Sequence, residues 1–125
     1  MKRLTFLLLL IIFSTLTASA QNDLKKTRWT GIANIPSPME IVLEFKQDSL
    51  MMLSNTNDVL EVMHFSVKED LLVIKKISGM SPCSEEGASY RFSIKNETLF
   101  LVPVTDSCDE RLNAFTVEGY RKKTS

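Results

Sequence analysis

The sequence predicts an all-β fold: an eight-stranded antiparallel up-and-down β-barrel with one disulfide. Two observations carry this prediction. Short segments alternate apolar and polar residues with period 2, and turn residues separate them at near-regular spacing, with no helix-period segment after the first twenty residues. An open sheet of eight strands would leave two unpaired edges in solvent, so the strands are expected to close into a barrel.

The clearest element is a hairpin between the only two cysteines. Its first strand, 88–95, alternates apolar and polar side chains, Asn96 and Glu97 make the turn, and 99–104 returns as a more apolar strand. Cys83 and Cys108 therefore emerge at the same end, where a disulfide could join them. An even cysteine count in an exported chain favours this bond, and the chain-entropy model assigns such a loop about 3.5 kcal/mol of stabilisation.

The first twenty residues have the pattern of a secretory signal peptide. Lys2 and Arg3 precede an apolar run, and the small residues 18–20 fit cleavage before Gln21. The mature chain, 21–125, has the length of one domain. No cysteine lies directly after the cleavage point to carry a lipid, so we expect a secreted or periplasmic protein without a stable membrane anchor. We also expect a monomer.

The remaining elements follow from alternation and turn residues. Trp29 anchors the first strand, and Pro36 and Pro38 end it. In the fourth strand we expect Met63, Phe65 and Val67 to point inward, although Leu60 and Val62 make the opposite phase nearly as good. Besides the hairpin, the expected elements are a polar, frayed segment at 21–26, strands at 27–34, 39–45, 50–54, 59–68, 71–77 and 114–122, and a helical turn at 109–113.

The expected interior is crowded. A short barrel with this many large side chains should be filled, without a cavity of about 300 Å³ in its middle. Any binding should then occur at the mouth where the disulfide joins the 78–87 loop to the 105–113 turn. The candidate binding surface is Ser81, Glu85, Glu86, Asp109, Glu110 and Arg111. The side chains expected inside are Trp29, Met39, Ile41, Leu43, Phe45, Met63, Phe65, Tyr90, Phe92, Ile94, Leu99, Leu101, Phe115 and Val117.

Four stretches, RWTG near the mature start, GASYRFSIKNETLFL, DSCDER and the final GYRKK, together resemble the small lipocalin-like domains of exported bacterial proteins, in the wider calycin group. The resemblance implies a barrel that binds a small apolar or amphipathic molecule. It also implies that Trp29 closes one barrel end, with a basic residue of the last strand lying across it. Arg121 is the first choice for that residue, and Arg111 is its rival.

Charge and composition limit the other functions. Removal of the signal peptide leaves 13 basic and 15 acidic side chains, a net charge of −2, which does not favour nucleic acid. The chain has only one histidine, His64, and both cysteines are expected to be bonded, so it has few groups that could act as a general base or a nucleophile. We therefore expect no enzyme activity and no cofactor. Met51, Met52, Met63 and His64 could hold copper, but core packing is the better interpretation. The alternative function is a protein-interaction module, such as a periplasmic protease inhibitor that inserts a free 21–26 segment into its partner.

Overall fold

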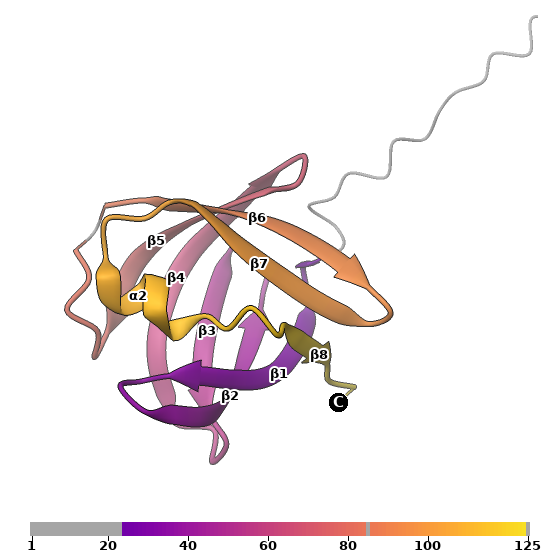
Figure 1. Ribbon diagram of the computed structural model, residues 1–125, viewed down its shortest axis with the longest axis horizontal. Coiled ribbons are helices and arrows are strands. Elements are labelled where there is room, and N and C mark those ends of the chain that lie inside the picture. The colour runs from indigo at the N-terminus through magenta and orange to yellow at the C-terminus, as the bar shows by residue number, and fades with distance from the viewer. Residues whose placement is uncertain (1–23, 85, 125) are drawn as a thin grey trace, which may run out of the picture.

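The computed structural model describes residues 24–84 and 86–124, and it confirms the predicted fold class. Eight antiparallel strands close into one up-and-down barrel in sequence order (Figure 1). A short helix, α2, connects the last two strands. The elements are β1 (Thr27–Asn34), β2 (Pro38–Phe45), β3 (Ser49–Ser54), β4 (Val59–Lys68), β5 (Leu71–Gly79), β6 (Ala88–Lys95), β7 (Thr98–Thr105), α2 (Asp109–Ala114) and β8 (Tyr120–Lys122).

The barrel has two different ends. The turns 46–48, 69–70 and 96–97 lie at the end where β1 begins, which we call the closed end. The turns 35–37 and 55–58, the 80–87 loop and α2 lie at the opposite end, which we call the open end. α2 is visible beside the ends of β4 and β5 at the left of Figure 1.

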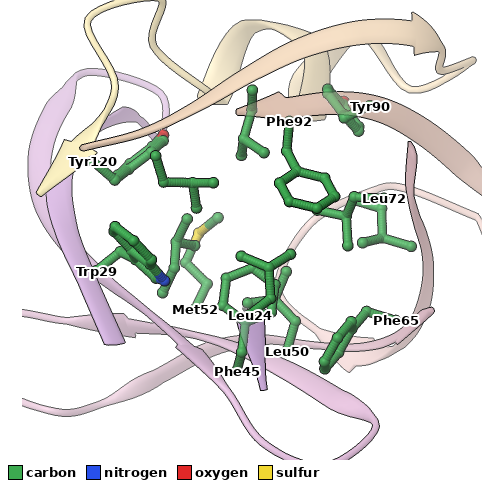
Figure 2. Close-up of a cluster of buried hydrophobic side chains, with 14 of the residues drawn as sticks. Leu24, Trp29, Phe45, Leu50, Met52, Phe65, Leu72, Tyr90, Phe92 and Tyr120 are labelled. Atoms are coloured by element: carbon green, nitrogen blue, oxygen red, sulfur yellow. The ribbon is translucent and has the colours of Figure 1, made fainter. Parts of the chain in front are cut away.

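The closed end is filled by side chains from β1, β2 and β3. Trp29, Phe45 and Leu50 are fully buried there and belong to one hydrophobic cluster (Figure 2). Leu24 joins this cluster at 0% exposure, although the 21–26 segment was expected to be frayed. Residues 1–23, which include the expected signal peptide, lie outside the described part of the chain.

Leu24 is held in place by its neighbours in the chain. The Trp29 indole Nε1 donates a hydrogen bond to Thr27 Oγ1 at 2.8 Å, and that hydroxyl donates to the Leu24 carbonyl at 2.5 Å. The expectation of a frayed segment was wrong at Leu24, because a single apolar side chain among polar neighbours carries no periodic signal. Burial of one leucine contributes about 1.5–3 kcal/mol toward ordering this short segment, and the two hydrogen bonds add to it.

The phase of β4 is decided by the structure. Met63 and Phe65 are buried and the intervening His64 is exposed, as in the first of the two interpretations above. Val67 is half-buried and packs against the core. Glu61 is also buried on this face, and an irregularity in the pairing with β5 lies between Val62 and Met63.

The last strand is shorter than predicted. Only Tyr120–Lys122 pair with β1 and β7, while Phe115 makes a single bridge to Ala33. Val117, expected inside, is 89% exposed, because the chain turns between Thr116 and Gly119 and Tyr120 enters the core instead. The absent side chain of Gly31 makes room for that ring: a Cβ there would lie 2.5 Å from Tyr120 Cδ1.

Most of the other residues expected inside are buried. Met39 and Phe115 are half-buried against the core, and Ile94 is 37% exposed because it lies beside the 96–97 turn at the end of its hairpin. The expectation for Ile94 was therefore wrong. The predicted Cys83–Cys108 disulfide is present, with its Cα atoms 5.4 Å apart, and joins the 80–87 loop to the start of α2.

Candidate functional site

A pocket of about 560 Å³ opens at the open end of the barrel. Its walls come from the end of β1 and the turn after it, from β2, β3 and β4, from the loop after β5, and from α2 with the residue that follows it. This pocket contains three of the predicted surface residues: Ser81, Glu110 and Arg111. Its lining comprises Asn34, Ile35, Pro36, Met39, Met52, Leu60, Glu61, Met63, Met80, Ser81, Pro82, Cys83, Glu110, Arg111, Asn113, Ala114 and Phe115.

Methionine is the most frequent residue in the lining. Four of the six methionines of the chain, Met39, Met52, Met63 and Met80, line this one pocket. Met52 and Met63 are buried at its inner wall, whereas Met80 is 83% exposed at the rim. The unbranched, polarisable methionine side chain adapts to irregular shapes, so this lining can fit more than one apolar ligand.

A buried ion pair forms one polar wall. Glu61 on β4 is only 8% exposed, and its Oε1 lies 3.3 Å from the Lys76 Nζ on β5. The Ser81 backbone N–H donates to Glu61 Oε2 at 3.1 Å, and Lys76 also donates to the Ser81 carbonyl. These contacts hold the start of the 80–87 loop against the barrel.

The space for the Glu61 carboxylate depends on a glycine. Gly79 pairs with Glu61 across the two strands and has a φ of +140°, a conformation that other residues rarely adopt. A Cβ at this position would lie 2.7 Å from Glu61 Cδ. Glu61 Oε1 accepts no hydrogen bond from any described residue, although Lys76 is its ion-pair partner.

A second buried cluster supports the other side of the pocket. Arg111 donates from Nε and Nη2 to the two carboxylate oxygens of Asp106 at 2.6 and 2.7 Å, a bidentate geometry. The Tyr90 hydroxyl and the Cys108 backbone N–H also donate to Asp106. Arg111 is therefore fixed in position, and its charge is balanced by a carboxylate beside it.

The pKa values of this cluster follow from its contacts. Burial alone would raise the pKa of Asp106, but the hydrogen bonds from Arg111, Tyr90 and Cys108 outweigh it and lower that pKa. Burial and the hydrogen bond to Asp106 raise the pKa of Tyr90, and the same carboxylate raises the pKa of Arg111. The cluster therefore holds a carboxylate, a neutral phenol and a guanidinium at neutral pH.

The other predicted surface residues lie near the pocket but do not line it. Glu86 is exposed and accepts a hydrogen bond from the Ser107 hydroxyl at 3.0 Å, and Asp109 is exposed on α2. Glu85 lies outside the described residues. The disulfide thus brings the two acidic segments to one rim, as the sequence indicated.

The structure does not bring Arg121 to Trp29. Arg121 is exposed and pairs with Thr30, while Trp29 pairs with Lys122 in the register of β1 and β8. Side chains alternate across a strand, so Lys122 is on the Trp29 side of the sheet and Arg121 is on the outer side. The rival, Arg111, lies at the open end, far along the barrel from Trp29.

Sequence reasoning missed Glu61, Lys76 and Asp106. The only signal for Glu61 was its position two residues before Met63 and four before Phe65. This spacing places its side chain on the same, inward face of the strand. Asp106 lies five residues before Arg111, a spacing that predicts no contact in a loop. In the described part of the chain, His64 is exposed on the outer face of β4, and no three histidine, cysteine or acidic side chains gather in a way that could hold a metal ion.

The chain matches no protein-family model, no curated protein and no solved structure. The arguments about function therefore come from the pocket. Among residues 24–84 and 86–124, no helix is long and apolar enough to cross a membrane.

Proposed function

We propose that this protein is an exported, secreted or periplasmic, lipocalin-like barrel without catalytic activity that binds a small apolar or amphipathic molecule at its open end. The observation that supports this is the pocket of about 560 Å³ with its methionine-rich wall. Pockets for small molecules commonly have volumes of about 300–1,000 Å³ and are mostly apolar with a few placed polar groups. This one has both properties.

The rest of the barrel limits how a ligand could enter. The closed end is filled by Leu24, Trp29, Phe45 and other buried side chains, so the pocket has its opening at the other end only. The disulfide and the Glu61 contact to Ser81 fix the loop beside that opening. A preformed rim lowers the entropy that is lost when a ligand binds.

The alternative function, a protease inhibitor with an inserting N-terminal segment, has less support. That hypothesis needs a free 21–26 segment, whereas Leu24 is fully buried in the barrel core. The export proposal rests on the residues 1–20 pattern and on the disulfide, a bond typical of oxidising compartments.

A fluorescence titration tests the proposal. The mature protein is titrated against N-phenyl-1-naphthylamine, an uncharged apolar dye at neutral pH, and we expect saturable binding at a 1:1 ratio. Leu60→Trp adds bulk to a half-buried residue of the pocket wall and should weaken binding by about tenfold or more. Ile94→Trp, an equal addition near the closed-end turn, is the matched control and should leave binding unchanged. An absence of saturable binding, or equal affinity of both variants, would contradict the proposal.

A further inference from the structure

The two ends of the barrel carry opposite charge. Toward the open end, the described acids outnumber the bases, and three of these acids, Glu86, Asp109 and Glu110, lie on the segments that the disulfide joins. The closed end is basic, because pairing of β1 with β8 brings two basic stretches together: Lys123 N–H donates to the Arg28 carbonyl at 2.8 Å. The basic residues on these two stretches are Lys25, Lys26, Arg28, Arg121, Lys122 and Lys123.

The charges inside the pocket do not offer a site for an anion. Arg111 is the only basic residue in the lining, and two of its nitrogens are bound to Asp106. Lys76, behind the wall, is held by Glu61 and Ser81. Neither cation is left without a balancing carboxylate.

The rim of the pocket carries one acidic side chain that no basic side chain of the described residues balances. Glu110 lines the opening, is exposed, and forms no salt bridge within the described chain. Deeper in the wall, the buried Glu61 carboxylate is paired with Lys76 and accepts the Ser81 backbone N–H, so its charge is already balanced. A ligand with a positive head therefore meets an unbalanced carboxylate at the rim, that of Glu110.

We propose that the pocket selects amphiphiles with a cationic head, such as alkylammonium compounds, over fatty carboxylates of equal chain length. This inference rests on the proposed function. The apolar chain would lie along the methionine wall formed by Met39, Met52 and Met63. The head would remain at the rim beside Glu110, where the acidic surroundings attract a cation and repel an anion.

Three ligands with the same decyl chain test the inference: decyltrimethylammonium, decanol and decanoate, each below its micelle concentration, measured by isothermal titration calorimetry at low salt. We expect decyltrimethylammonium to bind about tenfold tighter than decanoate, with decanol between them. In 0.5 M NaCl the ratio should fall to about threefold or less, because salt screens exposed charges.

The outcomes separate the inference from the function on which it rests. Equal affinities for the three ligands, or tighter binding of decanoate, would overturn the cationic preference and leave the proposed apolar pocket standing. Binding of none of them, together with no binding of the uncharged dye, would overturn both.

Charge variants locate the effect. Glu110→Gln should lower the preference for decyltrimethylammonium over decanoate by about threefold, while decanol affinity stays unchanged. Glu97→Gln, at the closed-end turn, is the matched control and should leave the preference unaltered. Because Glu110 is exposed, its variant is expected to fold. Equal preferences in the Glu110→Gln and wild-type proteins would count against the rim as the recognition element.

Discussion

The closed and open ends of this barrel are built from the same eight strands but filled differently. At the closed end, Leu24, Trp29 and Phe45 pack into a core without buried charge. At the open end, two buried ion pairs and a disulfide surround a pocket with a methionine wall. The difference suggests that packing stabilises one end, whereas directional contacts hold the other end in shape and leave room for a ligand.

The largest effect should come from breaking the open-end ion pair. Asp106→Ala leaves Arg111 buried without its carboxylate, and we expect the free energy of unfolding to fall by about 3–5 kcal/mol in urea denaturation. The double variant Asp106→Leu, Arg111→Met removes both charges and should recover most of this loss. If the single variant were as stable as the wild type, the ion pair would not be what holds the open end.

The ion pair of Asp106 and Arg111 also predicts that the free energy of unfolding falls at acid pH. Because the pKa of Asp106 is lowered in the folded protein, its contribution to stability is present above about pH 4 and is lost as the pH falls through the lowered pKa. Urea unfolding curves at pH 2 to 6 measure this loss of stability. The double variant has no carboxylate at position 106, so its stability should fall less over the same pH range.

Truncation of a side chain to alanine should lower stability at the closed end and ligand affinity at the open end. Leu24→Ala removes a fully buried side chain, and we expect a loss of about 3 kcal/mol with ligand affinity unchanged at temperatures where the protein is folded. Met39→Ala, the matched change in the half-buried pocket wall, should cost about 1 kcal/mol or less and weaken dye binding severalfold. The reverse pattern would show that the two ends do not divide these roles.

Ionisation of Tyr120 gives a fourth test, of how burial in the core affects stability at high pH. Burial raises the pKa of Tyr120 in the core to about 12, so its contribution is present below the unfolded pKa near 10 and is lost as the pH rises toward 12. Two pKa units correspond to about 2.7 kcal/mol. Tyr120→Phe should therefore flatten the decline in stability between pH 10 and 12, measured by urea denaturation, and an unaltered decline would contradict burial as its cause.

The smallest effect is expected at Arg121. Its side chain is exposed on the outer face, so Arg121→Ala should change the free energy of unfolding by less than about 0.5 kcal/mol and leave Trp29 fluorescence unchanged. Lys122→Ala, the matched variant of the residue that pairs with Trp29, is expected to shift the emission more. A larger effect at Arg121 would restore it as the residue that covers the tryptophan.

The sequence by itself determined the architecture. Alternation with period 2 placed β1, β2, β4, β5 and the hairpin of β6 and β7 within a few residues, because such a pattern reports which face of a strand meets the core. The two cysteines flanking that hairpin predicted the disulfide, and with it the end of the barrel where a pocket is found. These features are local, or follow from pairing of strands adjacent in sequence.

Only the tertiary structure decided what lies at each end. Leu24 is buried because closure of the barrel leaves a space that one leucine fills, and Val117 is exposed because Tyr120 takes the interior beside Gly31. The pairing of Glu61 with Lys76 depends on the register of β4 against β5 and on the room left by Gly79. The pocket exists because methionines from three strands and one loop meet at the open end, a sum of long-range contacts that no local pattern of residues encodes.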